Sequence, residues 1–220
     1  MLVLGIDEAG RGACIGPLVI AGVVIDEKDE QRLKKMGVKD SKLLTPRQRE
    51  RIAKEIEKVA KDIIIQKIGA CKIDNYRREG INLNQVEAIK MADIINLTKP
   101  DIAYLDSPDP KPEKFGKFVE KMVRYDVKIL SSNFAERRWV AVAAASIIAK
   151  VNRDKEIEQI RQKYGLKGSG YPADPETEEW LREWYEKNKK FPEIVRQSWE
   201  NVREIKKRKF SLLSWLKHKS

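Results

Sequence analysis

The chain has few of the residues and segments that mark exported, membrane-bound or zinc-binding proteins. It contains 2 cysteines and 1 histidine in 220 residues, and Cys14 and Cys71 form neither a disulfide framework nor a metal-site spacing. Its longest mainly apolar run covers residues 140–149, about half of the roughly 20 residues that a membrane span needs. Two acidic residues, at positions 7 and 8, interrupt the segment where a signal peptide would be apolar. We therefore expect a cytoplasmic protein without membrane contact.

Acidic residues are also fewer than basic residues. The chain has 45 Lys and Arg against 34 Asp and Glu, a formal net charge of +11, and residues 201–220 contain seven basic residues and one acidic residue. A basic protein favours polyanionic partners such as nucleic acid. A basic terminus can equally be a solvated segment that improves solubility, so the charge alone leaves both interpretations open.

The hydrophobic pattern predicts an α/β fold, with a mixed five-stranded sheet flanked by helices and a helical C-terminal part. Apolar runs predict strands at residues 2–6, 17–25, 63–68, 102–105 and 127–130, the first two as an antiparallel pair. Thr45 as N-cap and Pro46 as first helical residue predict a helix that ends near Ala60. Further helices are predicted at residues 31–36, 83–97, 113–123, 141–164, 176–187 and 192–207.

We predict three segments along the chain. A catalytic core covers residues 1–167, a helical part packed on that core covers residues 168–207, and a basic tail covers residues 208–220.

Acidic residues stand at the ends of the predicted strands. Asp7 and Glu8 end the first strand, Asp106 ends the fourth, and Glu136 follows the fifth. Strand ends of one sheet lie close together, and clustered carboxylates resist ionisation unless a cation neutralises them. Oxygen ligands of this kind suit Mg²⁺ or Mn²⁺, and two such ions can activate water and stabilise the leaving oxygen of a phosphodiester.

Each of these acidic residues also has an ordinary structural interpretation. Asp7 and Glu8 are compatible with a turn or a solvated cap, and Asp106-Ser-Pro-Asp is compatible with turn chemistry. Glu136 precedes two arginines and is compatible with a surface charge cluster. The spacing alone therefore does not decide between a metal site and surface structure.

Five sequence blocks favour the metal site over surface structure, because they resemble a known family. They read Gly5-Ile-Asp7-Glu8-Ala-Gly10-Arg11-Gly12 with Ile15-Gly16-Pro17, then Asp40-Ser41-Lys42-Leu43, Tyr104-Leu-Asp106-Ser-Pro, Ala143-Ala-Ala-Ser146-Ile-Ile-Ala-Lys150-Val-Asn-Arg153-Asp154, and Gly168-Ser-Gly-Tyr171-Pro-Ala-Asp174-Pro. In this order they resemble the signature of ribonuclease HII, the type 2 ribonucleases H, and the last block is similar to the archaeal form. The blocks span residues 1 to about 200.

The resemblance implies a ribonuclease H-like fold and a set of site residues. It implies catalytic metal ligands at Asp7, Glu8, Asp106 and the position of Glu136, which are expected to hold two Mg²⁺ or Mn²⁺ ions. It implies that the turn Gly10-Arg11-Gly12 senses the ribose 2′-hydroxyl, because glycine lets the backbone approach closely, and that Tyr171 stacks on the sugar at the RNA-to-DNA junction. Phosphate contacts are expected from Lys42, Ser146 and Lys150, although packing or a helix-surface role is open for Ser146 and Lys150.

The implied activity is hydrolysis of the RNA strand of RNA/DNA hybrids and cleavage on the 5′ side of single ribonucleotides in duplex DNA. The products are a 3′-hydroxyl and a 5′-phosphate. The fourth acidic position departs from the family's usual Asp after His-Lys-Ala and reads Asn133-Phe134-Ala135-Glu136. Because glutamate adds a methylene, it can displace a ligand by about an ångström, at a cost in rate. The alternative is therefore a catalytically weakened protein that binds hybrid duplexes; a different nuclease or recombinase on the same fold would lack the glycine turn and Tyr171.

The C-terminal tail predicts a protein partner. Leu212, Trp215 and Leu216 have the spacing of the hydrophobic positions in peptides that dock on sliding clamps, although Lys209 stands where those peptides have Gln and Leu216 replaces the second aromatic residue. An amphipathic tail folded back on the body is the open alternative. We expect a monomer that binds RNA/DNA hybrids, ribonucleotide-containing duplex DNA and a clamp.

Overall fold

The computed structural model describes residues 1–38 and 44–207. The predicted phosphate contact Lys42 and the predicted clamp-binding residues lie outside the described residues. The strands are β1 (Leu2–Ala9), β2 (Leu18–Asp26), β3 (Asp62–Ile68), β4 (Ile102–Asp106) and β5 (Lys128–Ser132). The helices are α1 (Glu30–Lys35), α2 (Pro46–Val59), α3 (Ala70–Arg78), α4 (Leu83–Thr98), α5 (Pro112–Glu120), α6 (Val140–Tyr164) and α7 (Pro175–Asn188), with the short 3-10 helices η1 (Glu27–Asp29) and η3 (Ala135–Arg137) and a helical segment at residues 200–207.

The chain divides into two compact units. Unit 1 comprises Met1–Arg11, Val19–Lys67 and Ile81–Asp154, and unit 2 comprises Gly12–Leu18, Ile68–Gly80 and the described part of Lys155–Ser220. In this division Gly12–Leu18 and Ile68–Gly80 group with the residues from Lys155 onward, and the segment boundaries after residues 167 and 207 stay a prediction. None of the helices within residues 1–38 and 44–207 has the length and hydropathy of a membrane span.

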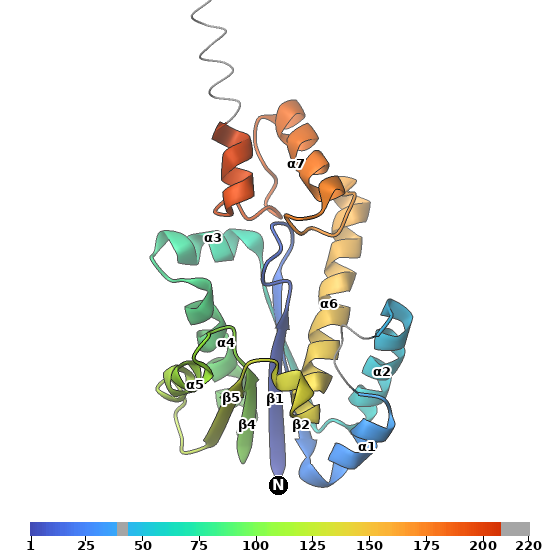
Figure 1. The fold of residues 1–220 in the computed structure, drawn as a ribbon, viewed down its shortest axis with the longest axis vertical. Coiled ribbons are helices and arrows are strands. Elements are labelled where there is room, and N and C mark those ends of the chain that lie inside the picture. Colours follow the sequence, from blue (N-terminus) through green and yellow to red (C-terminus); the bar gives the residue numbers. More distant parts are fainter. Residues whose placement is uncertain (39–43, 208–220) are drawn as a thin grey trace, which may run out of the picture. The chain divides into compact units, whose positions relative to one another are not determined.

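Unit 1 contains the predicted five-stranded mixed sheet, and its strand order is β3-β2-β1-β4-β5. Figure 1 shows β1 at its centre, between β2 and β4. β1 pairs with β2 in antiparallel orientation and with β4 in parallel orientation, and β4 pairs in parallel with β5. Since parallel neighbours end at the same edge, this order brings the ends of β1, β4 and β5 together.

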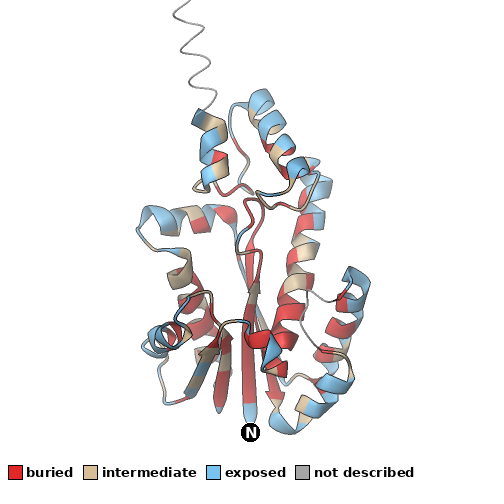
Figure 2. Cartoon of the chain, viewed as in Figure 1, coloured by how far each residue is buried: buried red, intermediate tan, exposed pale blue. Residues whose placement is uncertain are grey.

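Helices cover both faces of this sheet. A Cβ placed on Gly5 of β1 would lie 2.1 Å from the backbone of Ala141, so α6 approaches β1 on that face. On the opposite face, a Cβ on Gly22 would lie 2.5 Å from a methyl group of Ile94 in α4. Figure 2 shows that buried residues follow β1, β2 and the first turns of α6. The sequence therefore folds as helices, sheet and helices in layers, with β1 in the core.

Local signals explain where the flanking helices begin. Thr45 accepts a hydrogen bond from the backbone N–H of Gln48 and completes a capping box, with Pro46 at the first position, as predicted. Asn82 caps α4 in the same way through Gln85. These caps satisfy the free N–H groups of the first helical turn and fix both helix starts.

Unit 2 has its own apolar core and corrects two predictions. Its core includes Cys14, Ile15, Ile157, Leu166, Trp180, Leu181, Phe191, Val195 and Val202. The helix α3 was not predicted. The prediction of a helix from residue 192 was wrong for residues 192–199, which form turns and a bridge between Ile15 and Val195. There the backbone N–H of Arg196 donates to Cys14, and Gly16 donates to Ile194, so pairing with another segment replaces helical hydrogen bonds.

Candidate metal centre

Three carboxylates meet at the edge of the sheet where β1 and β4 end. One carboxylate oxygen each of Asp7, Glu8 and Asp106 lies within 4.8 Å of the others. The strand register explains the meeting, because Ile6 pairs with Leu105 and the acidic residues follow at the next positions. Asp7 and Glu8 lie inside β1, which extends to Ala9 and is longer than predicted.

The protein holds two of these carboxylates by specific donors. Asp7 accepts a side-chain hydrogen bond from Ser146 of α6 and another, at 2.6 Å, from the backbone N–H of Glu8. Asp106 Oδ1 accepts from the backbone N–H of Ala135 at 2.8 Å. These contacts orient the oxygens before any ligand arrives.

The group resists ionisation in the absence of a cation. Burial raises the pKa of Asp7 well above its usual 3.8, and the charges of Glu8 and Asp106 raise it further. Burial likewise raises the pKa of Glu8 above its usual 4.5, and the nearby Glu87 and Asp106 act in the same direction. Glu8 Oε2 is buried and accepts no hydrogen bond from the described residues. A buried oxygen without a donor, among like charges, fits coordination to a divalent cation.

Glu136 lies outside this set of three carboxylates. It belongs to η3 between β5 and α6 and is buried, with 7% of its surface exposed. Its neighbour Ala135 donates to Asp106, which places the backbone of η3 against the carboxylates. The role of Glu136 as a fourth ligand stays a prediction.

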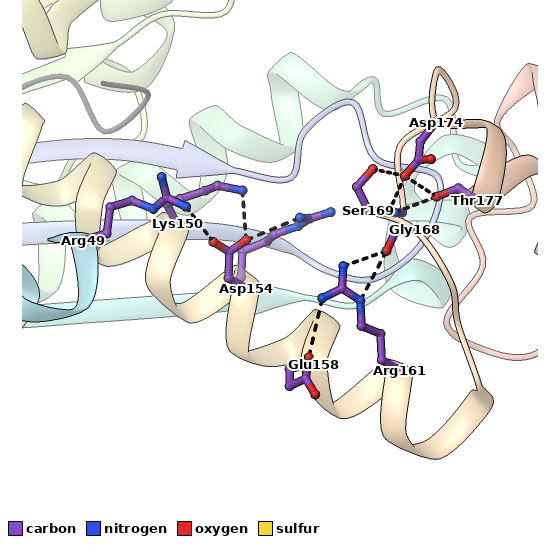
Figure 3. A network of polar contacts seen from close by, with 11 residues as sticks. Arg49, Lys150, Asp154, Glu158, Arg161, Gly168, Ser169, Asp174 and Thr177 are labelled. Carbon is purple, nitrogen blue, oxygen red and sulfur yellow. Dashed lines mark hydrogen bonds and ion pairs between the residues drawn. The ribbon is translucent and has the colours of Figure 1, made fainter. Parts of the chain in front are cut away.

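The described phosphate candidates have protein partners. Ser146 is buried and donates to Asp7. Lys150 Nζ lies 2.9 Å from Asp154, whose other oxygen contacts Arg49 at 3.3 Å (Figure 3). These contacts agree with the packing and surface roles left open for Ser146 and Lys150, and phosphate contact by either stays a prediction.

The pattern analysis missed Glu87 and Asn84 of α4. Arg11, of the predicted 2′-hydroxyl-sensing turn, forms an ion pair with the fully buried Glu87 and donates to Asn84 Oδ1 at 2.6 Å. Burial raises the pKa of Glu87 to about 7, although the Arg11 guanidinium beside it acts in the opposite direction. A charged residue within the apolar run Val86-Glu87-Ala88 was the signal that the sequence offered.

The structure describes Gly10, Gly12 and Tyr171, whose substrate contacts stay predictions. Gly10 has φ 83°, a left-handed conformation that glycine adopts without strain. Within unit 2, a Cβ on Gly12 would lie 3.9 Å from the ring of Tyr171. Asp174 accepts from the backbone N–H and the hydroxyl of Ser169, at 2.5 and 2.6 Å, and so closes the loop that carries Tyr171 (Figure 3).

Comparisons with known proteins agree on one family. The family model described as Ribonuclease HII matches residues 4–202. The ribonuclease HII of Pyrococcus furiosus is 45% identical, over 93% of this chain and 91% of that protein, and that of Methanothermobacter thermautotrophicus is 46% identical, over 94% of this chain and 100% of that protein.

Two solved structures show the same fold over most of the chain. The ribonuclease H2 of Pyrococcus horikoshii superposes with a TM-score of 0.89 at 44% identity, covering 94% of this chain and 98% of that one. The ribonuclease HII in a complex with PCNA from Archaeoglobus fulgidus gives a TM-score of 0.84 at 42% identity, covering 91% and 96%.

Proposed function

Since the chain belongs to the ribonuclease HII family of endoribonucleases, we propose that Asp7, Glu8 and Asp106 bind the divalent cations with which it hydrolyses RNA in RNA/DNA hybrids. It cuts the RNA strand of hybrids and cuts on the 5′ side of single ribonucleotides in duplex DNA. The observation that carries the proposal is the convergence of the three carboxylates within 4.8 Å at one sheet edge. The binding-only alternative has no support beyond the substitution at Glu136.

The carboxylates act as ligands and their donors fix them. Asp7, Glu8 and Asp106 would hold two Mg²⁺ or Mn²⁺ ions, and ions in this position would supply activation of water and stabilisation of the leaving 3′-oxygen. Ser146 and the backbone of Glu8 hold Asp7, and the backbone of Ala135 holds Asp106, so little reorganisation is needed when the phosphate arrives. Glu136 is the proposed fourth ligand, and its longer side chain reaches from η3.

Recognition of the substrate is assigned to three sets of residues. The turn Gly10-Arg11-Gly12 reads the 2′-hydroxyl through close backbone approach. Tyr171 stacks on the sugar that follows the ribonucleotide, on the loop that Asp174 closes. Lys42, Ser146 and Lys150 contact phosphates, which positions the duplex without reading its sequence.

A sliding clamp is the proposed protein partner. The relative from Archaeoglobus fulgidus, 42% identical, was solved in a complex with PCNA. Leu212, Trp215 and Leu216 of this chain have the spacing of a clamp-docking peptide. A chain ending at Lys209 should lose affinity for the clamp and keep its nuclease activity, and unchanged clamp affinity would refute the assignment. We also propose that the protein is a cytoplasmic monomer.

The test of the nuclease is cleavage of a labelled DNA duplex that contains one ribonucleotide, with Mg²⁺, Mn²⁺ or a chelator. We expect metal-dependent cutting on the 5′ side of the ribonucleotide and its loss in Asp7→Asn, which removes a charge with little change of shape. Lys58→Gln is the matched control, because Lys58 forms an exposed ion pair with Glu55 on α2. Tight binding without cutting in either metal would replace the nuclease by the binding-only alternative.

A further inference from the structure

Arg11 is anchored to the protein and not directed freely into solvent. Its guanidinium makes an ion pair with Glu87 and a 2.6 Å hydrogen bond to Asn84, both on the first turns of α4. A third of the Arg11 side chain is exposed, whereas the Glu87 side chain has no exposed surface. The arginine therefore spans from a buried anchor to the surface of unit 1.

A fully buried glutamate such as Glu87 does little to stabilise the fold. Its neighbours Val86 and Ala88 are buried and apolar, and its oxygen Oε1 accepts no hydrogen bond from the described residues. A buried ion pair is seldom more stabilising than an apolar side chain of similar volume, so a positioning role accounts for it better than stability does. The other oxygen of Glu87, Oε2, pairs with the Arg11 guanidinium. The positioning role of Glu87 therefore concerns Arg11.

The anchor continues to the loops that follow β4 and β5. Asn84 Nδ2 donates to Asp109 at 3.4 Å. Asn133, after β5, donates to the backbone carbonyls of Ser107 and Asp109 at 2.8 Å each. Because Ser107 directly follows Asp106, one polar chain links Arg11 to the loop that begins at a clustered carboxylate.

We propose that Glu87 and Asn84 are positioning residues: they fix Arg11, and through it the backbone at Gly10, so that the enzyme prefers a ribonucleotide to a deoxyribonucleotide. The inference rests on the proposed function of the glycine turn. Neither residue touches the substrate; both act through Arg11. Loss of the anchor therefore lowers selectivity for the 2′-hydroxyl more than it lowers affinity for duplex.

The experiment measures a ratio that a purely structural role would not change. The affinities for a duplex with one ribonucleotide and for the same all-DNA duplex are measured in Ca²⁺, so that the substrate stays uncut, alongside the unfolding temperature. Glu87→Gln and Asn84→Ala should each lower the ratio of the two affinities at least fivefold. Asp93→Asn, which breaks a partly buried ion pair with Lys90 on the same helix, should leave the ratio unchanged.

A double-mutant cycle tests whether the residues act through Arg11. Glu87→Gln combined with Arg11→Gln should lower the ratio no more than Arg11→Gln alone. If Glu87→Gln and Asn84→Ala both keep the wild-type ratio of affinities, the inference is overturned, whatever their unfolding temperatures. The proposed function stays intact in that case, as long as the wild type itself prefers the duplex with the ribonucleotide. A wild-type enzyme without that preference would instead refute the proposed role of the turn itself, and the inference with it.

Discussion

The close approach of β1 and α6 predicts a severe effect from adding one methyl group at Gly5. A Cβ there would lie 2.1 Å from the backbone carbon of Ala141 and 2.3 Å from the backbone nitrogen of Val142. Ordinary contact begins near 3.4 Å, so strand and helix must separate by about an ångström. Overpacking of this kind costs about 1–3 kcal/mol or somewhat more, which lowers the unfolding temperature by roughly 2–12 °C in a domain of this size.

The same displacement should reach the carboxylates. Asp7 follows Gly5 on the same face of β1, and its donor Ser146 lies on α6. Because a shift of about 1 Å can cost on the order of 100-fold in rate, Gly5→Ala should lose cleavage activity even where it remains folded. The assays are thermal unfolding and cleavage of the single-ribonucleotide duplex.

Two other glycines of unit 1 provide matched controls. At Gly22 the added methyl would meet a side-chain methyl of Ile94 at 2.5 Å, which can move more easily than backbone, so we expect a smaller loss of stability. At Gly116 the contact is 3.2 Å to Ser131, and alanine favours the helix, so we expect a change within about 1 kcal/mol. If Gly5→Ala unfolds like the wild type and cuts as fast, the β1–α6 packing argument is refuted.

Three further predictions follow from charge and hydrogen bonding. Folding raises the pKa values of Asp7 and Glu8 and so favours their protonated forms, which means that their contribution to metal-free stability is complete below about pH 4 and is lost as pH rises through the raised values. The increase in unfolding temperature on adding Mn²⁺ should therefore grow from about pH 5 to pH 8. An increase that shrinks as pH rises would contradict this prediction. Asp174→Ala removes the acceptor for Ser169 and the cap of α7, and should lower the free energy of unfolding in urea by about 1–3 kcal/mol. A loss of stability smaller than the error of the fit would argue against closure of the Tyr171 loop by Asp174. Asp154→Ala removes the carboxylate that three cationic neighbours share and should cost roughly 1–2 kcal/mol, because the carboxylate is partly exposed. Unchanged thermal unfolding would exclude this value.

Much of unit 1 was predictable because local and long-range forces agree there. The apolar run of β2, the Thr45 cap and the apolar start of α6 each specify an element that the sheet then buries. The meeting of Asp7 with Asp106 follows once the strand order is known, since the acidic residues stand at equivalent positions on parallel neighbours.

Unit 2 was less predictable because its elements depend on distant partners. The helix α3 begins at Ala70, and its N-cap Gly69 provides no side-chain cap. Its Asp74 accepts from the backbone N–H groups of Gln197 and Ser198. No short-range pattern reports such contacts. The same pairing keeps residues 192–199 out of the helix that their sequence favours.

Glu87 and Glu136 show why site residues are harder to predict than elements. Glu87 stands in an apolar helix and belongs to no motif, so only the fold shows that it meets Arg11. Glu136 stands at a motif position, yet a 3-10 turn sets its orientation, and sequence spacing does not specify that geometry.

Direct titration of Mn²⁺ into the substrate-free enzyme tests the carboxylate site most directly, with Asp106→Asn as the comparison and Asp109→Asn as a carboxylate control in the following loop. Asp109 lies outside the group of three, so its variant should bind Mn²⁺ like the wild type. We expect saturable binding to the wild type, with proton release, and at least tenfold weaker binding to Asp106→Asn, since one charged ligand is lost. Equal affinity in the wild type and Asp106→Asn would contradict the assignment of the three carboxylates as the metal centre.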